Sequence, residues 1–164
     1  MPNTFSASGN NGSGPASAFR TESSTTHHSI ELDGEPLNYR ATAAWTTLRK
    51  IHKPVAEVFH TSYFVDTDDN VSRPLTFVFN GGPGSASLWL HMGVFGPQRL
   101  ALPDAMDDGA APFDVVENVH SILDVADLVF VDPVGTGWSR TLGEGQTSDY
   151  WGVTEDAESL ATFI

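Results

Sequence analysis

Two continuous apolar runs constrain the fold of this chain more than any other feature. The runs are LTFVFN (75–80) and DLVFVD (127–132). Runs of this kind are typical of strands covered on both faces, as parallel strands inside an α/β sheet are. We therefore expect an α/β fold with two buried parallel strands. Between them we expect one helix near 86–93 and a loop rich in Asp, Ala and Pro at 101–114.

The segment before these runs has a strand pattern of a different kind. HHSIEL and LNYRATAAW flank the turn sequence DGEP, and in LNYRATAAW (37–45) apolar residues alternate with polar ones. This arrangement predicts an antiparallel hairpin. VAEVFHTSYFV (55–65) predicts another strand, and the polar stretch 66–74 predicts a surface loop. Antiparallel strands are thus expected to lead into the parallel ones.

The two ends of the chain differ in character from its middle. Residues 1–24 are rich in Gly, Ser and Asn and predict a disordered tail, which leaves 25–164 as the folded domain. Near the other end, Ser148 or Asp149 is expected to cap a helix that has an apolar face. No stop signal follows this helix, so we expect a truncated chain. The face consists of Val153, Ala157, Leu160 and Ile164.

Charge and composition exclude some classes of function. The chain has 21 acidic and 8 basic residues, a formal net charge of −13, which opposes binding to nucleic-acid phosphates. It has no cysteine and therefore no disulfide or thiolate metal site. No signal peptide and no membrane-spanning run is visible. We expect no membrane partner, and a cytoplasmic chain as written, or an exported one if the start is incomplete.

The first apolar run ends in a glycine-rich loop, NGGPG (80–84). A loop of this kind between a strand and a helix exposes backbone N–H groups and favours an anion or an oxyanion. A phosphate loop is disfavoured, because no Lys stands where a Walker sequence needs one and Pro83 lacks an N–H. The alternative is a tight turn in which the glycines only supply unusual backbone angles.

Three ordered motifs together carry a family resemblance. NGGPGSASLWLHMGVFGP, then DLVFVDPVGTGWS, then DYWGVTEDAESLATFI resemble the amino-terminal part of the serine carboxypeptidase family, particularly its bacterial members. The similarity runs from about Thr26 to Ile164. It implies an α/β-hydrolase-type sheet. It also implies that the intact enzyme hydrolyses peptides through an acyl-enzyme, without a metal or an organic cofactor. The chain would end before the nucleophile elbow of that fold.

The resemblance also assigns roles to the loop. It implies that Asn80 and the Gly81 backbone bind the carboxylate of a peptide's last residue, and that the Gly82 N–H is one of two oxyanion-hole donors. A backbone donor is already aimed at the developing charge, which fits this role. Val94 departs from the family, since many members have an acidic residue there, and strict carboxy-terminal specificity is therefore in doubt.

The stretch DPVGTGWS, Asp132 to Ser139, resembles a family loop that shapes the wall beside the active site. We give its glycines and Trp138 a supporting role. A strand-to-loop turn with a packed aromatic side chain is an equally good interpretation.

The groups that attack a peptide bond are missing from the sequence. An α/β-hydrolase carries its nucleophile in a G-x-S-x-G elbow, and none of the four serines near glycines has this pattern. The six histidines have no triad or metal-ligand context. We therefore predict that the chain alone is inactive, because the nucleophilic Ser and the Asp and His of a catalytic triad are absent from it. The serines are Ser13, Ser85, Ser87 and Ser139, and the histidines are His27, His28, His52, His60, His91 and His120.

Two alternatives remain open at this point. GGPG after a strand also occurs in proline aminopeptidase-like enzymes and other α/β-hydrolases, although these usually have His where Asn80 stands. The chain could instead be a non-catalytic module whose loop binds peptide ends or another anion. Unpaired strand edges argue against such a module, because they favour aggregation.

Overall fold

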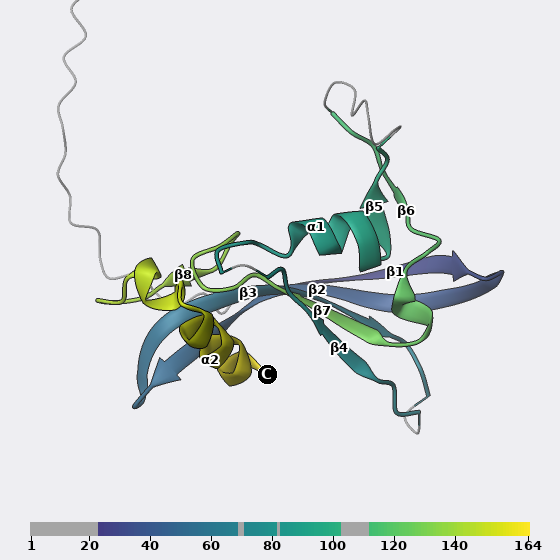
Figure 1. The fold of residues 1–164 in the computed structure, drawn as a ribbon. Helices are drawn as coiled ribbons and strands as arrows, with labels where there is room; N and C mark the ends of the chain where they lie inside the picture. The colour runs from purple at the N-terminus through teal and green to yellow at the C-terminus, as the bar shows by residue number, and fades with distance from the viewer. Residues whose placement is uncertain (1–22, 69–70, 82, 103–111) are drawn as a thin grey trace, which may run out of the picture.

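One mixed β-sheet forms the framework of the protein (Figure 1). The computed structural model describes residues 23–68, 71–81, 83–102 and 112–164. Within them the sheet order is β1-β2-β3-β7-β4, with β8 paired to β3. Its strands are β1 (Ser24–Leu32), β2 (Glu35–Lys50), β3 (Lys53–Val65), β4 (Leu75–Val78), β7 (Asp127–Val131) and β8 (Arg140–Thr141).

The predicted hairpin is confirmed in β1 and β2. Asp33 and Gly34 form its turn with φ angles of 51° and 83°, the positive values that a type I′ turn requires. β3 pairs antiparallel with β2 and confirms the next predicted strand. Of the predicted tail, residues 1–22 lie outside the described residues, and Ser24 already pairs with Ala43.

The two apolar runs form the expected parallel pair. β4 and β7 run parallel, from Leu75 opposite Asp127 to Val78 opposite Phe130. β7 is covered on both faces, because Phe130 packs into one buried cluster and Val129 into another. β4 is less covered than predicted, since Leu75 is exposed and the described residues place a strand on only one side of it.

Short helical segments lie on the two faces of the sheet (Figure 1). The helix predicted near 86–93 is α1 (Leu88–Leu90), which continues into a π-helical turn at His91–Phe95. It ends there because Gly96 is extended, the conformation favoured before a proline. Leu90 and Phe95 pack on the core cluster that contains Phe130. The opposite face carries α2 (Val153–Phe163), whose Phe163 packs on the second cluster.

The predicted start of the last helix was wrong. Ser148 and Asp149 lie in a separate 3₁₀ helix, Thr147–Tyr150, where the Asp149 carboxylate accepts the Gln146 N–H at 3.1 Å. α2 begins only after Gly152, because Asp149 is already engaged in capping this earlier turn.

The apolar face predicted for α2 is only partly buried. Leu160 is buried, whereas Val153 and Ile164 are 78% and 66% exposed. With Phe79 and Ala161 they line an open apolar groove of about 500 Å³.

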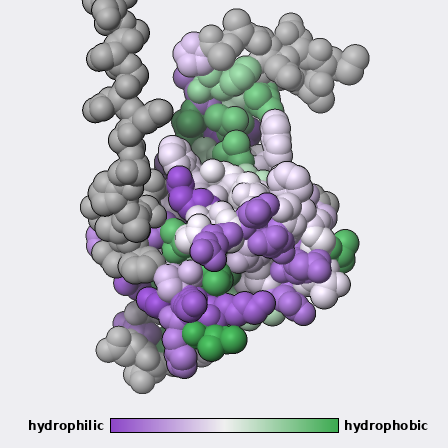
Figure 2. Space-filling model, turned by 90° about the vertical axis from the view of Figure 1, so that its left-hand side faces the viewer, coloured by the Kyte–Doolittle hydropathy of each residue, from purple (hydrophilic) through white to green (hydrophobic). Residues whose placement is uncertain are grey.

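A two-stranded ladder was not predicted. β5 (Gln98–Leu100) and β6 (Val115–Glu117) pair antiparallel beside the segment expected to be a loop, most of which, 103–111, lies outside the described residues. The ladder projects from the sheet, and Figure 2 shows apolar residues on this projection above a mostly polar body. No helix in the described part of the chain is long and apolar enough to cross a membrane.

Candidate functional site

The glycine-rich loop begins where β4 ends. Asn80 is half-buried and Gly81 is exposed, with no neighbouring atom within 4 Å of the position that a Cβ would take. Gly84 has a φ of +102°, a conformation that side-chain-bearing residues rarely adopt. Gly82, the predicted oxyanion donor, lies outside the described residues. The described part of the loop is therefore open, and one of its glycines is required by backbone conformation.

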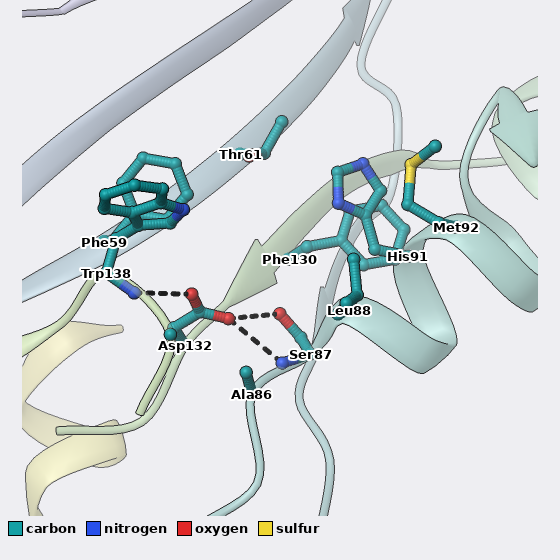
Figure 3. A pocket seen from close by; sticks show the side chains of 11 residues that line it. Phe59, Thr61, Ala86, Ser87, Leu88, His91, Met92, Phe130, Asp132 and Trp138 are labelled. Carbon is teal, nitrogen blue, oxygen red and sulfur yellow. Dashed lines mark hydrogen bonds between the residues drawn. The ribbon is translucent and has the colours of Figure 1, made fainter. Parts of the chain in front are cut away.

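A buried aspartate connects the segment after this loop to β7, the neighbour of β4 in the sheet. Asp132 follows β7, and its Oδ1 accepts the Ser87 backbone N–H at 3.0 Å and the Ser87 hydroxyl at 3.1 Å. Its Oδ2 accepts the Trp138 N–H at 3.2 Å. Figure 3 shows these bonds at the base of a pocket. The carboxylate thus holds the start of α1 against the loop after β7.

The loop after β7 is tied down on several sides. The Ser139 hydroxyl donates to the Asp132 carbonyl at 2.6 Å and accepts the Phe59 N–H at 2.7 Å. Gly135 and Gly137 have positive φ angles, and a Cβ at Gly137 would overlap the Asp132 carboxylate. The turn interpretation of these glycines therefore has direct structural support.

Trp138 is not the packed aromatic side chain of that interpretation. It is 61% exposed, and only its backbone is anchored. Its carbonyl accepts the Trp45 indole N–H at 3.2 Å and an Arg140 N–H at 3.1 Å. The exposed indole is available to form one wall of a site.

A pocket of about 310 Å³ lies between β3, α1 and the loop after β7. Phe59 and Trp138 lie on one side of it, and His91 and Phe130 on the other, with Asp132 below (Figure 3). Thr61, Ala86, Ser87, Leu88, Met92 and Gly137 complete the lining.

His91 is held as a neutral ring in this wall. It stacks on Phe130 with ring centroids 4.3 Å apart, and its Nε2 lies 2.6 Å from the Tyr63 hydroxyl. Burial lowers the pKa of His91 to about 4, although the Asp132 charge opposes this shift. Burial also raises the pKa of Tyr63. At neutral pH this contact therefore joins two uncharged groups.

The described serines do not form a nucleophile arrangement. Ser87 and Ser139 both donate to Asp132, and no serine hydroxyl in the described segments bonds a histidine ring. Ser13 lies outside the described residues. Val94, where the family acid would stand, is 46% exposed, and its carbonyl accepts the Asn118 amide at 2.8 Å.

The histidines are dispersed through the fold. His27 and His28 lie on the edge strand β1, as expected, and His60 is on β3 with its ring against Phe163. Over the described ranges, no group of three or more His, Cys, Asp or Glu could hold a metal ion.

Sequence reasoning did not find the bonds from Asp132 to Ser87. The only signal was an acidic residue directly after a buried strand, and 45 positions separate it from its partner. Parallel pairing of β4 and β7 brings the two loops to the same edge of the sheet.

The fold and the site are those of an α/β protein. Antiparallel strands lead into a parallel pair, and the loops after both parallel strands meet at one edge, where α/β proteins bind their ligands. The family model for serine carboxypeptidases matches residues 49–164, so this chain belongs to the serine carboxypeptidase family. The match leaves out β1 and most of β2. No curated protein matches the chain.

Proposed function

We propose that this chain supplies the oxyanion loop and part of the substrate pocket of a serine-type carboxypeptidase, which hydrolyses peptides through an acyl-enzyme. The family match over 49–164 carries the proposal. In this assignment the Gly82 N–H stabilises the tetrahedral oxyanion, and Asn80 with the Gly81 backbone binds the terminal carboxylate of a peptide. No metal or organic cofactor takes part.

The geometry around the loop supports this assignment. Asn80 and Gly81 lie at the carboxyl end of a parallel strand, and Gly81 has open space in front of it. The bonds from Asp132 to Ser87 anchor the end of the loop. An anchored backbone donor does not have to reorient as charge develops, which is why such donors contribute strongly to catalysis.

The remaining catalytic groups belong to the proposed longer enzyme. The sequence contains no G-x-S-x-G elbow. Among the described residues no strand pairs with the second edge of β4, and an open apolar groove lies beside Phe79 and Leu160. A further strand of an α/β-hydrolase sheet would pair with this edge and cover apolar surface beside it. We therefore propose that residues 25–164 are the amino-terminal part of such a domain.

The role of Asn80 can be tested in that longer enzyme. Asn80→Ala should lower kcat/KM for peptides with a free carboxyl terminus and affect amidated peptides much less, because only the carboxylate loses its partner. Steady-state kinetics on matched free-acid and amidated peptides measure the difference. Equal losses on both would place Asn80 in the turn only and favour a more general hydrolase.

The isolated chain is the control for the catalytic assignment. Residues 1–164 should not hydrolyse blocked dipeptides above the buffer rate and should not react with a fluorophosphonate serine probe. Stoichiometric labelling would mean that one of the serines present is an activated nucleophile, and the proposed division of the active site would be wrong.

A further inference from the structure

Two aspartates flank β7, and their charges are compensated differently. Asp127, at the start of the strand, pairs with Arg73 at 3.0 Å and also accepts the Val65 N–H. Asp132, directly after the strand, is 7% exposed and makes no ion pair with a described residue. Buried carboxylates are normally paired with a cation. Within the described segments, the negative charge of Asp132 is therefore balanced by hydrogen bonds and not by a cation.

One of the two carboxylate oxygens has capacity left. Oδ1 accepts two bonds from Ser87, whereas Oδ2 accepts one, from the Trp138 N–H. An ionised carboxylate offers roughly four acceptor positions, two on each oxygen. Oδ2 therefore has an acceptor position left, and Asp132 is among the residues that line the pocket of about 310 Å³.

The walls of the pocket suit a cation with an apolar body. Phe59 and Trp138 face His91 and Phe130 across it, and no Lys or Arg is among its lining residues (Figure 3). The faces of aromatic side chains attract organic cations, because the ring quadrupole is negative there. His91 adds no repulsion, since its pKa is lowered to about 4 and the ring is neutral at pH 7.

We propose that this pocket binds a small organic cation, an ammonium or amidinium group on an apolar body. The charged group donates to Asp132 Oδ2, and the body lies between the side chains of Trp138 and His91, the latter backed by the buried ring of Phe130. The formal net charge of −13 favours the approach of such a ligand. None of the described residues of the glycine-rich loop is among the lining residues of the pocket, and the tests below measure binding to the chain itself rather than peptidase activity.

Benzamidine and benzamide test the charge requirement on the chain itself. The two probes have nearly the same shape, but only benzamidine is a cation. Backbone and indole resonances in ¹H–¹⁵N spectra should shift on titration with benzamidine, with the largest changes at Gly137 and Trp138. A charge-assisted hydrogen bond contributes about 1.5–3 kcal/mol, so benzamide should bind roughly ten- to a hundredfold more weakly.

Variants connect the binding to the named side chains. Asp132→Asn keeps the shape, removes the charge and should weaken benzamidine binding at least about tenfold. Because Asp132→Asn also weakens the bonds to Ser87, Trp138→Leu provides an independent test through an exposed side chain. It should weaken binding severalfold. Trp151→Leu is the matched control, since Trp151 is 59% exposed and lies outside the pocket, and it should leave binding unchanged.

The source of the cation is distinguished by a second pair of probes. A blocked tripeptide with a central arginine is compared with the same peptide carrying citrulline, its neutral analogue. Binding of benzamidine and the arginine peptide would indicate a pocket for basic side chains, and binding of benzamidine alone a pocket for free small cations. Equal binding of benzamidine and benzamide, no shifts at Gly137 and Trp138, or an unchanged affinity in Trp138→Leu would each overturn the proposal.

Discussion

Replacing Gly137 by alanine tests the connection made by Asp132. Gly137 has a φ of +47°, and an added Cβ would overlap Oδ2 of that carboxylate. Gly143 provides the matched control, because its φ is +63° and a Cβ there meets nothing within 4 Å. Both alanines carry the left-handed backbone penalty of about 1–2 kcal/mol. Only Gly137→Ala also displaces the carboxylate.

The additional cost follows from the hydrogen bonds of Asp132. Three donors bind this carboxylate at 3.0, 3.1 and 3.2 Å. A hydrogen bond to a charged group contributes about 1.5–3 kcal/mol. Loss of one or two of them should make Gly137→Ala less stable than Gly143→Ala by at least about 2 kcal/mol. In a chain of this length that difference lowers the melting temperature by about 4–8 °C more.

Thermal and urea unfolding of both variants, followed by circular dichroism, measure this difference. Amide hydrogen exchange locates the damage, which should appear at Ser87 and Trp138 in Gly137→Ala and at neither in Gly143→Ala. If the two alanines destabilise the chain equally, the overlap at Gly137 is relieved without moving Asp132, and the connection between the two loops contributes little.

Three further predictions concern single side chains. His91 has a pKa lowered to about 4 by burial, against an ordinary 6.5, so the unfolded chain takes up a proton that the folded chain does not as the pH falls from about 6.5 to 4. The free energy of unfolding, measured with urea, should therefore fall by up to about 2 kcal/mol between pH 7 and pH 5. The decrease should be smaller in His91→Gln, and an equal decrease in both proteins would contradict this prediction. In the proposed longer enzyme, Gly82→Val should lower kcat by about 10²-fold or more by crowding the proposed oxyanion donor; an unchanged kcat would remove Gly82 from that role. Val94→Glu should sharpen the preference for free carboxyl termini at acidic pH, where a protonated Glu can donate to the carboxylate, and a pH-independent preference would speak against this.

Local patterns were sufficient for several parts of the fold. Asp33 and Gly34 predicted the first turn, because few dipeptides tolerate two consecutive positive φ angles. The two apolar runs predicted the parallel pair, since a strand buried on both faces has no polar side to alternate. The glycine-rich loop and the motifs around it predicted the family that the match over 49–164 identifies. The proposed roles of Asn80, Gly81 and Gly82 rest on that resemblance.

Other features depend on contacts between distant segments. The sequence by itself determined the longer strands β1, β2 and β3, the parallel pair β4 and β7, the first turn and the position of the loop, because these follow from the side-chain pattern of neighbouring residues. Only the tertiary structure decided that Asp132 binds Ser87, that α2 begins after Gly152, and that Trp138 stays exposed beside a pocket. The physical reason is the large separation along the sequence of the residues that interact. A hydrogen-bond partner 45 residues away, or the helical turn that takes Asp149 as its own cap, is set by how the strands pair and pack, and no local pattern records it.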